Sequence, residues 1–164
     1  MIEKYLKLCK FLSKACGIFA AACMILSILI ITELVFERYF FQHSITWQNE
    51  LVTILLVAST FIGCAYVLSI KGHVNMEYIY SFLTDKNKII LQIFTSSLAL
   101  IFFLFLFYLA FEITYGAFIK NYTTGTIWDP PLWIPYSSMF IGATVTVLQY
   151  IAEVIYLLKD LKKI

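Results

Sequence analysis

The sequence predicts an all-α integral membrane protein with four transmembrane helices, and three observations lead to this class. Hydrophobic residues make up 62% of the 164 residues and charged residues only 13%, about half the charged share of a soluble domain. About 20 residues of helix cross a hydrocarbon core of roughly 30 Å, and lipid-exposed backbone must satisfy its hydrogen bonds within a helix or a closed barrel. Barrel strands are shorter and alternate with period two. Four stretches are long enough and hold no charged residue: 15–32, 51–70, 89–111 and 132–152.

We expect one membrane domain, 1–164, with spans near 15–36, 47–70, 89–118 and 132–158. The first span could be a signal peptide, because it follows a basic segment and Ala20–Cys23 resembles a lipoprotein cleavage box. The residues after Cys23 stay apolar, however, whereas a mature N-terminus should become polar. An uncleaved span is therefore preferred.

The distribution of lysine and arginine predicts the orientation of the chain. Ten of the twelve cations fall in the N-terminal segment, the loop between the second and third spans, and the C-terminus; the other two are Arg38 and Lys120. Cytoplasmic loops carry the Lys/Arg excess. Both termini and the middle loop are therefore predicted on the cytoplasmic side of the membrane, and nothing in this charge pattern indicates nucleic-acid binding.

Two segments outside the spans have apolar residues at helical spacing. The basic N-terminal segment is expected to lie as an amphipathic helix on the inner membrane surface before turning into the first span. A short interfacial helix is expected in the cytoplasmic middle loop. The apolar positions that support them are Ile2, Tyr5, Leu6, Cys9 and Leu12 in the first, and Met76, Ile79, Tyr80 and Leu83 in the second.

Two further patterns concern packing between and around the spans. Small residues four apart permit close helix contact. They are Gly17 with Ala21, Ser59 with Gly63, and Ser138 with Gly142. The third span is rich in phenylalanine and is expected to present a bulky surface to lipid or to a partner protein.

Cysteine and histidine placement disfavours a quinone- or haem-linked membrane enzyme. Cys9, Cys16 and Cys23 recur every seven residues and form one helical stripe without a Cys-x-x-Cys pair, so packing explains them better than redox chemistry. His43 and His73 lie in loops on opposite sides of the predicted bilayer, whereas haem in a bundle needs axial ligands within the spans. We expect no metal, cofactor or catalytic residue in this chain.

The acidic residues leave one transport alternative open. A carboxylate at mid-bilayer is costly and usually functional, but Glu33, Glu50 and Glu112 all lie near the outer ends of their spans. A self-sufficient four-helix exporter that couples to protons through Glu33 or Glu112 remains the alternative to a non-catalytic subunit.

The stretches "ERYFFQHSITWQNEL" and "FIGCAYVLSIKGHVNME" resemble the small membrane subunit of tripartite ATP-independent periplasmic (TRAP) transporters. Family members show an arginine and an aromatic residue near the end of the first span, then Trp and Glu opening the second. They next show Gly within the second span, a Gly-His element with a following acid, and an entry to the fourth span similar to "LWIPY". The positions that match here are Arg38, Trp47, Glu50, Gly63, Gly72, His73, Glu77, Trp133 and Pro135.

The resemblance implies a scaffold that carries no substrate itself. A large membrane subunit of such a transporter moves an organic acid, such as a C4-dicarboxylate or sialic acid, together with sodium by an elevator-like motion. A periplasmic binding protein delivers the substrate, and the small subunit widens the footprint of the large one among the membrane lipids. Sodium coupling is expected in the large subunit.

These implications suggest anchoring roles for the matched residues. Trp47 and Glu50 would set the outer depth of the second helix. Lys71, Gly72 and His73 would set its inner end. Arg38 is the expected partner of Glu33, Glu37 or Glu50 at the outer rim.

Overall fold

The computed structural model describes residues 2–41, 47–70 and 85–161, and all its regular structure is helical apart from one isolated bridge between Thr123 and Pro131. The predicted class is confirmed, because four helices are long and apolar enough to cross a membrane. Orientation relative to the membrane stays a prediction. The helices are α1 (Ile2–Phe40), α2 (Trp47–Ser69), α4 (Asp85–Ile119) and α5 (Trp133–Leu161).

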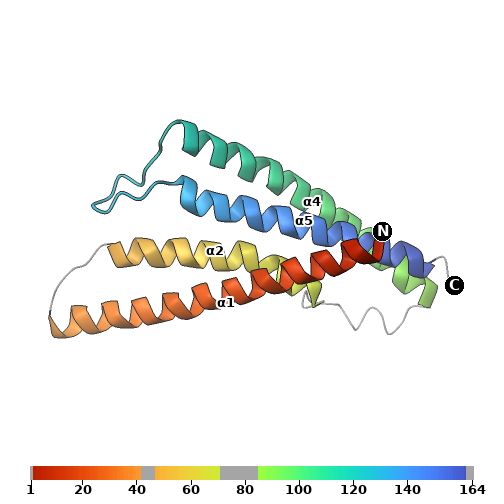
Figure 1. Ribbon diagram of the computed structural model, residues 1–164, viewed down its shortest axis with the longest axis horizontal. Coiled ribbons are helices and arrows are strands. Elements are labelled where there is room, and N and C mark those ends of the chain that lie inside the picture. The colour runs from red at the N-terminus through yellow and green to blue at the C-terminus, as the bar shows by residue number, and fades with distance from the viewer. Residues whose placement is uncertain (1, 42–46, 71–84, 162–164) are drawn as a thin grey trace.

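The helices form two antiparallel hairpins, α1–α2 and α4–α5, which meet through α2 and α5 (Figure 1). Across the molecule the order is therefore α1, α2, α5, α4. The helices converge at the end that holds both chain termini, called here the terminal end (Figure 1). They spread toward the opposite end, the loop end, where Phe40, Trp47, Ile119 and Trp133 bound the helices.

Small residues bring α1 and α2 close together, as their spacing predicts. Ser59 donates a hydrogen bond from Oγ to the carbonyl oxygen of Ala20 at 2.9 Å. One turn along α2, a Cβ placed on Gly63 would lie 3.2 Å from the Cβ of Ala20. In a membrane such close contacts replace the hydrophobic drive that holds soluble helices together.

The cysteine stripe of α1 packs against α2 in its middle and against α5 at the terminal end. Cys23 is buried in a cluster with Ala58 and Ile62 of α2, and Cys16 packs against that cluster. Cys9, also buried, lies at the terminal end near the carbonyl oxygen of Leu148. The packing role predicted for these cysteines is thus confirmed.

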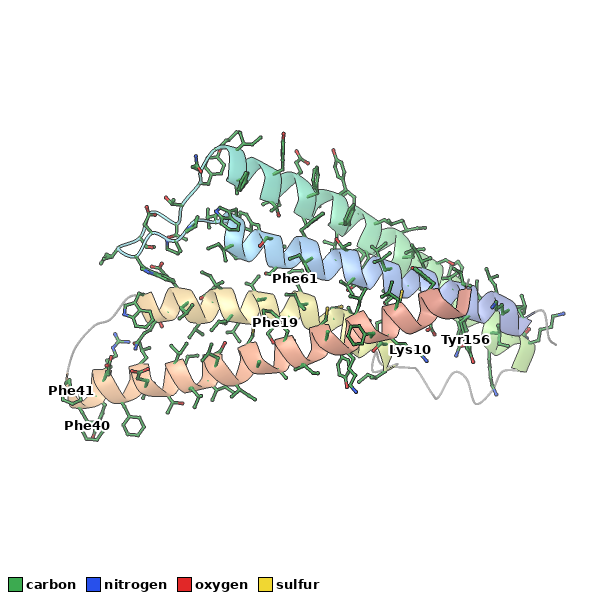
Figure 2. All side chains as sticks on the ribbon, viewed as in Figure 1. Lys10, Phe19, Phe40, Phe41, Phe61 and Tyr156 are labelled. Carbon is green, nitrogen blue, oxygen red and sulfur yellow. The ribbon has the colours of Figure 1, made fainter. Side chains whose placement is uncertain are left out.

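One backbone contact joins the two hairpins. Gly142 of α5 lies directly against the carbonyl group of Phe61 in α2, so any side chain here would collide with backbone. Phe61 is labelled in Figure 2 between these two helices. Thr146, one turn further along α5, is fully buried, and its hydroxyl donates a hydrogen bond to the carbonyl oxygen of Gly142 at 2.8 Å.

The phenylalanines of α4 divide between two faces. Phe103 packs on Tyr150 of α5 with ring centroids 5.4 Å apart, and Phe107 packs on Phe140 at 5.2 Å. Phe111 also contacts Phe140, at 5.7 Å, and Phe118 contacts Trp133, at 6.1 Å, although both side chains stay largely exposed. None of the residues in the most apolar 18-residue window of α4 is buried, against 44% in α5. The exposed aromatic residues of α4 are Phe94, Phe102, Phe105, Tyr108, Phe111, Tyr115 and Phe118.

The N-terminal segment differs from its prediction. It forms no separate surface helix, because residues 2–40 are one continuous helix. Its apolar face packs on α5: Tyr5 donates a hydrogen bond to the carbonyl oxygen of Leu148 at 3.0 Å, and Ser13 donates one to Oε1 of Gln149 at 3.1 Å. The hydroxyl of Tyr5 is protonated at neutral pH in any case, and burial, with a contribution from Cys9, raises its pKa further to about 12. The interfacial helix expected in the middle loop lies outside the described residues.

Candidate functional site

The connection between α4 and α5 is a small folded unit. Asn121 adopts φ 49° just after the last turn of α4, and the amide of Tyr122 donates back to the carbonyl oxygen of Ala117 at 3.1 Å. This is the left-handed cap that commonly ends a helix, and asparagine tolerates it. The chain then folds on itself, since Thr123 pairs with Pro131. We call residues 120–132 the outer hairpin loop, after the side of the membrane that the charge pattern predicts for it.

Internal hydrogen bonds hold the tip of the outer hairpin loop. Gly125, at φ 69°, donates its amide to Oδ1 of Asp129 at 2.8 Å, and Asp129 donates its own amide to Oγ1 of Thr126 at 3.3 Å. Asp129 itself sits at φ 49°. The hydroxyls of Thr124 and Thr126 share a hydrogen bond of 2.7 Å. The tip therefore has a defined shape although its side chains are exposed.

This loop reaches across to the first hairpin. Trp128 meets Trp47, the first residue of α2, edge to face with ring centroids 6.3 Å apart. At the start of α5, Trp133 makes a similar contact with Phe118 of α4 at 6.1 Å. Phe40 and Phe41 project from the tip of α1 at the same end, opposite Lys10 and Tyr156 (Figure 2). The loop end is therefore rich in aromatic residues, as at a membrane–water boundary.

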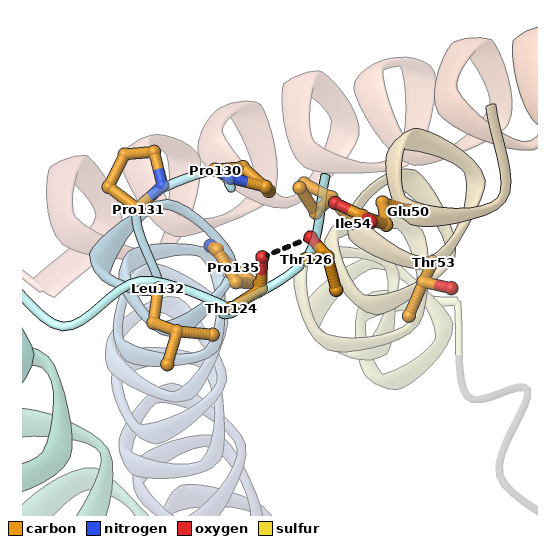
Figure 3. A pocket seen from close by; sticks show the side chains of 9 residues that line it. All are labelled: Glu50, Thr53, Ile54, Thr124, Thr126, Pro130, Pro131, Leu132 and Pro135. Atoms are coloured by element: carbon orange, nitrogen blue, oxygen red, sulfur yellow. Dashed lines mark hydrogen bonds between the residues drawn. The ribbon is translucent and has the colours of Figure 1, made fainter. Parts of the chain in front are cut away.

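A pocket of about 200 Å³ opens between α2 and the outer hairpin loop (Figure 3). Glu50, Thr53 and Ile54 contribute from the first turns of α2, and the remaining walls come from the loop and the start of α5. The lining is mostly apolar, with one carboxylate. The loop and α5 residues that line it are Thr124, Thr126, Pro130, Pro131, Leu132 and Pro135.

Three side-chain oxygens at this end are buried without a hydrogen-bond partner in the described part of the chain. They belong to Glu50, Glu37 and Gln48. Gln48 is only 1% exposed, so its side chain has almost no contact with bulk solvent. Arg38 was predicted to pair with a nearby carboxylate, yet it is exposed in the last turns of α1 and donates neither to Oε2 of Glu37 nor to Oε2 of Glu50.

The structure brings some of the other sequence-predicted residues to this site. Trp133 begins α5, and Pro135 stands in its first turn, where a missing N–H costs nothing; Pro135 also lines the pocket. Gly63 lies apart, at the α1–α2 contact. Gly72, His73 and Glu77 lie outside the described residues.

Two candidate proton-coupling acids lie on the flanks of the molecule. Glu33 on α1 and Glu112 on α4 are both exposed, and these helices stand at opposite edges of the array. Within the described residues no group of three or more His, Cys, Asp or Glu side chains could hold a metal ion.

The sequence analysis assigned no role at this site to Thr126, Gln48 or Trp128. Trp128 and Thr126 reach the site through the fold of the outer hairpin loop, for which the only local signals were glycine, asparagine and proline. Gln48 offered a signal, since a polar amide at the start of a long apolar helix is unusual.

Comparison with known proteins decides the family of this chain. The profile of the DctQ component of the tripartite ATP-independent periplasmic transporters matches residues 27–160. The chain belongs to this family. A protein of Haemophilus influenzae, provisionally named TRAP transporter small permease protein, is 27% identical over 164 residues, covering 97% of this chain and 93% of the relative.

Membership of the DctQ family confirms the resemblance found in the sequence. The match extends from the middle of α1 to the last turns of α5, so it includes the pocket, the outer hairpin loop and the contact between the hairpins. The family places the chain as a small subunit of a TRAP transporter.

Proposed function

We propose that this chain is a non-transporting subunit that anchors and braces a large elevator-type membrane subunit. That subunit takes up an organic acid, a C4-dicarboxylate or sialic acid, with sodium, in the inner membrane of a bacterium. A periplasmic binding protein supplies the substrate at the loop end, which faces outward. The chain itself contributes shape and membrane depth to the complex.

The observation that carries this proposal is where the charges lie on the four helices. Ionised groups inside a bilayer usually mark an ion or substrate path. Here every charged residue of the described helices lies toward a helix end, and the stretches between are uncharged. The helix contacts are made instead by glycine, alanine, serine and cysteine. A bundle of this kind is suited to packing against another membrane protein rather than to carrying a charged solute.

The positions of Glu33 and Glu112 weigh against the exporter alternative. A proton-coupled carrier needs its acid on an internal path reached from both sides. Both carboxylates are instead exposed on the outermost helices, near the loop end. The two carboxylates therefore do not line a common path through the inside of the bundle.

We place the large subunit against α4 and lipid against the exposed face of α1. Aromatic side chains are enriched at protein interfaces, where they bury large areas at little entropic cost. α4 carries seven exposed aromatic residues along its length, whereas the exposed middle of α1, residues 18–31, is mainly aliphatic with Phe19 as its one aromatic ring. The other exposed aromatic residues of α1, Phe11, Phe36, Tyr39 and Phe40, lie toward its ends. The exposed aliphatic residues of α1 include Ile18, Ile25, Leu26, Ile28, Leu29 and Ile31.

Purification and reconstitution test the role of the chain. The tagged chain, extracted in mild detergent from cells that express its transporter genes, should bring down a larger many-span membrane protein. Vesicles that hold both membrane subunits and are supplied with the binding protein should accumulate the organic acid only under an inward sodium gradient. Vesicles that hold this chain alone should accumulate nothing. Solute movement by the chain alone would reject the proposal.

Paired substitutions test the α4 interface. Replacing Phe102 and Phe105 with alanine should reduce recovery of the large subunit several-fold and leave the isolated chain folded, because both side chains are exposed. Replacing Ile25 and Leu29 of α1 with alanine is the matched control and should leave recovery unchanged. The opposite ranking would place the large subunit on α1.

A further inference from the structure

The loop end is acidic, in contrast to the basic terminal end. The sequence places five carboxylates there against two cations, Arg38 and Lys120. Lys120 lies over the ring of Tyr122, 5.7 Å from its centroid, so it remains on its own loop. The carboxylates are Glu33, Glu37, Glu50, Glu112 and Asp129. A surface of this sign attracts a basic partner and speeds its approach.

The pocket at this end has the size of one side chain. Its volume of about 200 Å³ is below the range of roughly 300–1,000 Å³ that is usual for whole small-molecule ligands. Its walls of proline, isoleucine and leucine suit an aliphatic stem, and the carboxylate of Glu50 stands among them (Figure 3). Lysine and arginine have this division into an apolar stem and a charged head.

The carboxylate of Glu50 has one oxygen without a hydrogen-bond partner among the described residues, and it can therefore accept a bond from a cationic group. This oxygen, Oε2, is buried. The carboxylate stands in the first turn of α2, at the positive end of the helix dipole. An ionised carboxylate without a donor gains strongly from a charge-assisted hydrogen bond.

We propose that this pocket receives a lysine or arginine side chain from the soluble binding protein that docks on the loop end. This inference rests on the proposed function. A lipid headgroup that carries an ammonium group also carries a phosphate, which the surrounding carboxylates repel. A bare metal ion prefers several oxygen ligands, whereas most of this lining is apolar.

The pocket is already shaped before anything binds. The Trp47–Trp128 contact fixes the outer hairpin loop against α2, and the Thr123–Pro131 pairing holds the two arms of the loop together. Pre-organisation of this kind lowers the entropic cost of docking. One pocket can therefore contribute strongly to recognition even where the rest of the contact is small.

The test uses both membrane subunits together in phosphatidylcholine nanodiscs and the purified binding protein. Glu50→Gln keeps the shape of the side chain and removes its charge, so we expect the affinity for the binding protein to fall about tenfold. Glu33→Gln makes the same charge change on the exposed flank of α1 and should alter affinity less than twofold. Raising the salt concentration should weaken binding to the wild type more than to Glu50→Gln. Equal affinities for the two variants would overturn the proposal.

A photocrosslinker identifies the occupant directly. With p-benzoylphenylalanine in place of Ile127, which is 87% exposed beside the pocket residue Thr126, illumination should attach a peptide of the binding protein that contains lysine or arginine. Attachment to lipid alone would overturn the proposal in favour of a headgroup. Recovery of the large subunit with the unmodified chain is measured separately, and its failure would reject the proposed function.

Discussion

Gly142 offers the sharpest test of how the two hairpins are joined. A Cβ at this position would meet the carbonyl group of Phe61, which belongs to the backbone of α2 and cannot rotate away. The clash can be relieved only if α5 moves away from α2. Overpacking costs typically 1–3 kcal/mol, and an immovable neighbour argues for the upper part of that range. Alanine recovers up to about 1 kcal/mol of helix propensity over glycine. We therefore expect Gly142→Ala to destabilise the fold by about 2 kcal/mol.

Gly116 in α4 is the matched control. A Cβ there would meet nothing within 4 Å, so Gly116→Ala should be neutral or stabilising by up to about 1 kcal/mol. Reversible unfolding in mixed dodecylmaltoside and sodium dodecyl sulfate micelles, followed by tryptophan fluorescence, measures both variants. The two should differ by about 3 kcal/mol. Equal stabilities would show that α2 and α5 do not touch at Gly142.

Three further outcomes are expected in the same unfolding assay. Gln149→Leu removes the acceptor of the buried Ser13 hydroxyl and should lower the free energy of unfolding by about 1 kcal/mol, close to measured hydrogen bonds between membrane helices. Adding Ser13→Ala to this variant should restore part of the lost stability. Trp128→Ala should lower the free energy of unfolding by about 1 kcal/mol, the value of an aromatic pair, and should change the fluorescence of Trp47. An unchanged Trp47 spectrum would contradict the contact between the two rings. Asn121→Gly should be tolerated and Asn121→Val should cost about 1–2 kcal/mol, because a left-handed backbone disfavours a Cβ; equal stabilities would argue against this cap.

The four helices could be predicted because each depends on one local property, an uncharged stretch as long as the bilayer is thick. The contacts at Gly63 and Cys23 could also be predicted, since spacing alone places small side chains on one face of a helix. The course of the N-terminal segment could not. An amphipathic helix presents the same pattern whether its apolar face meets lipid or another helix, and only the distant Leu148 and Gln149 decide between the two.

The site at the loop end was only half predictable. The sequence singled out Trp47 and Glu50 as residues that set the depth of α2, and both lie at the pocket or beside it. The partner wall of the pocket comes from residues about 75 positions later, brought there by a left-handed turn at Asn121 and by the Trp47–Trp128 contact. No local pattern encodes that approach.

The pocket and the Gly142 contact are connected through the same helix. Glu50 and Ile54 lie on α2, and the opposite wall belongs to the second hairpin, so the width of the pocket depends on the spacing of the hairpins. Ile54 precedes Phe61 by two helical turns, about 10 Å along α2. Gly142→Ala should therefore weaken docking of the binding protein although it lies away from the pocket. Glu50→Gln should weaken docking with a much smaller change in the free energy of unfolding than Gly142→Ala. If Gly142→Ala lowered stability and left docking intact, the pocket would have to be held by the Trp47–Trp128 contact alone.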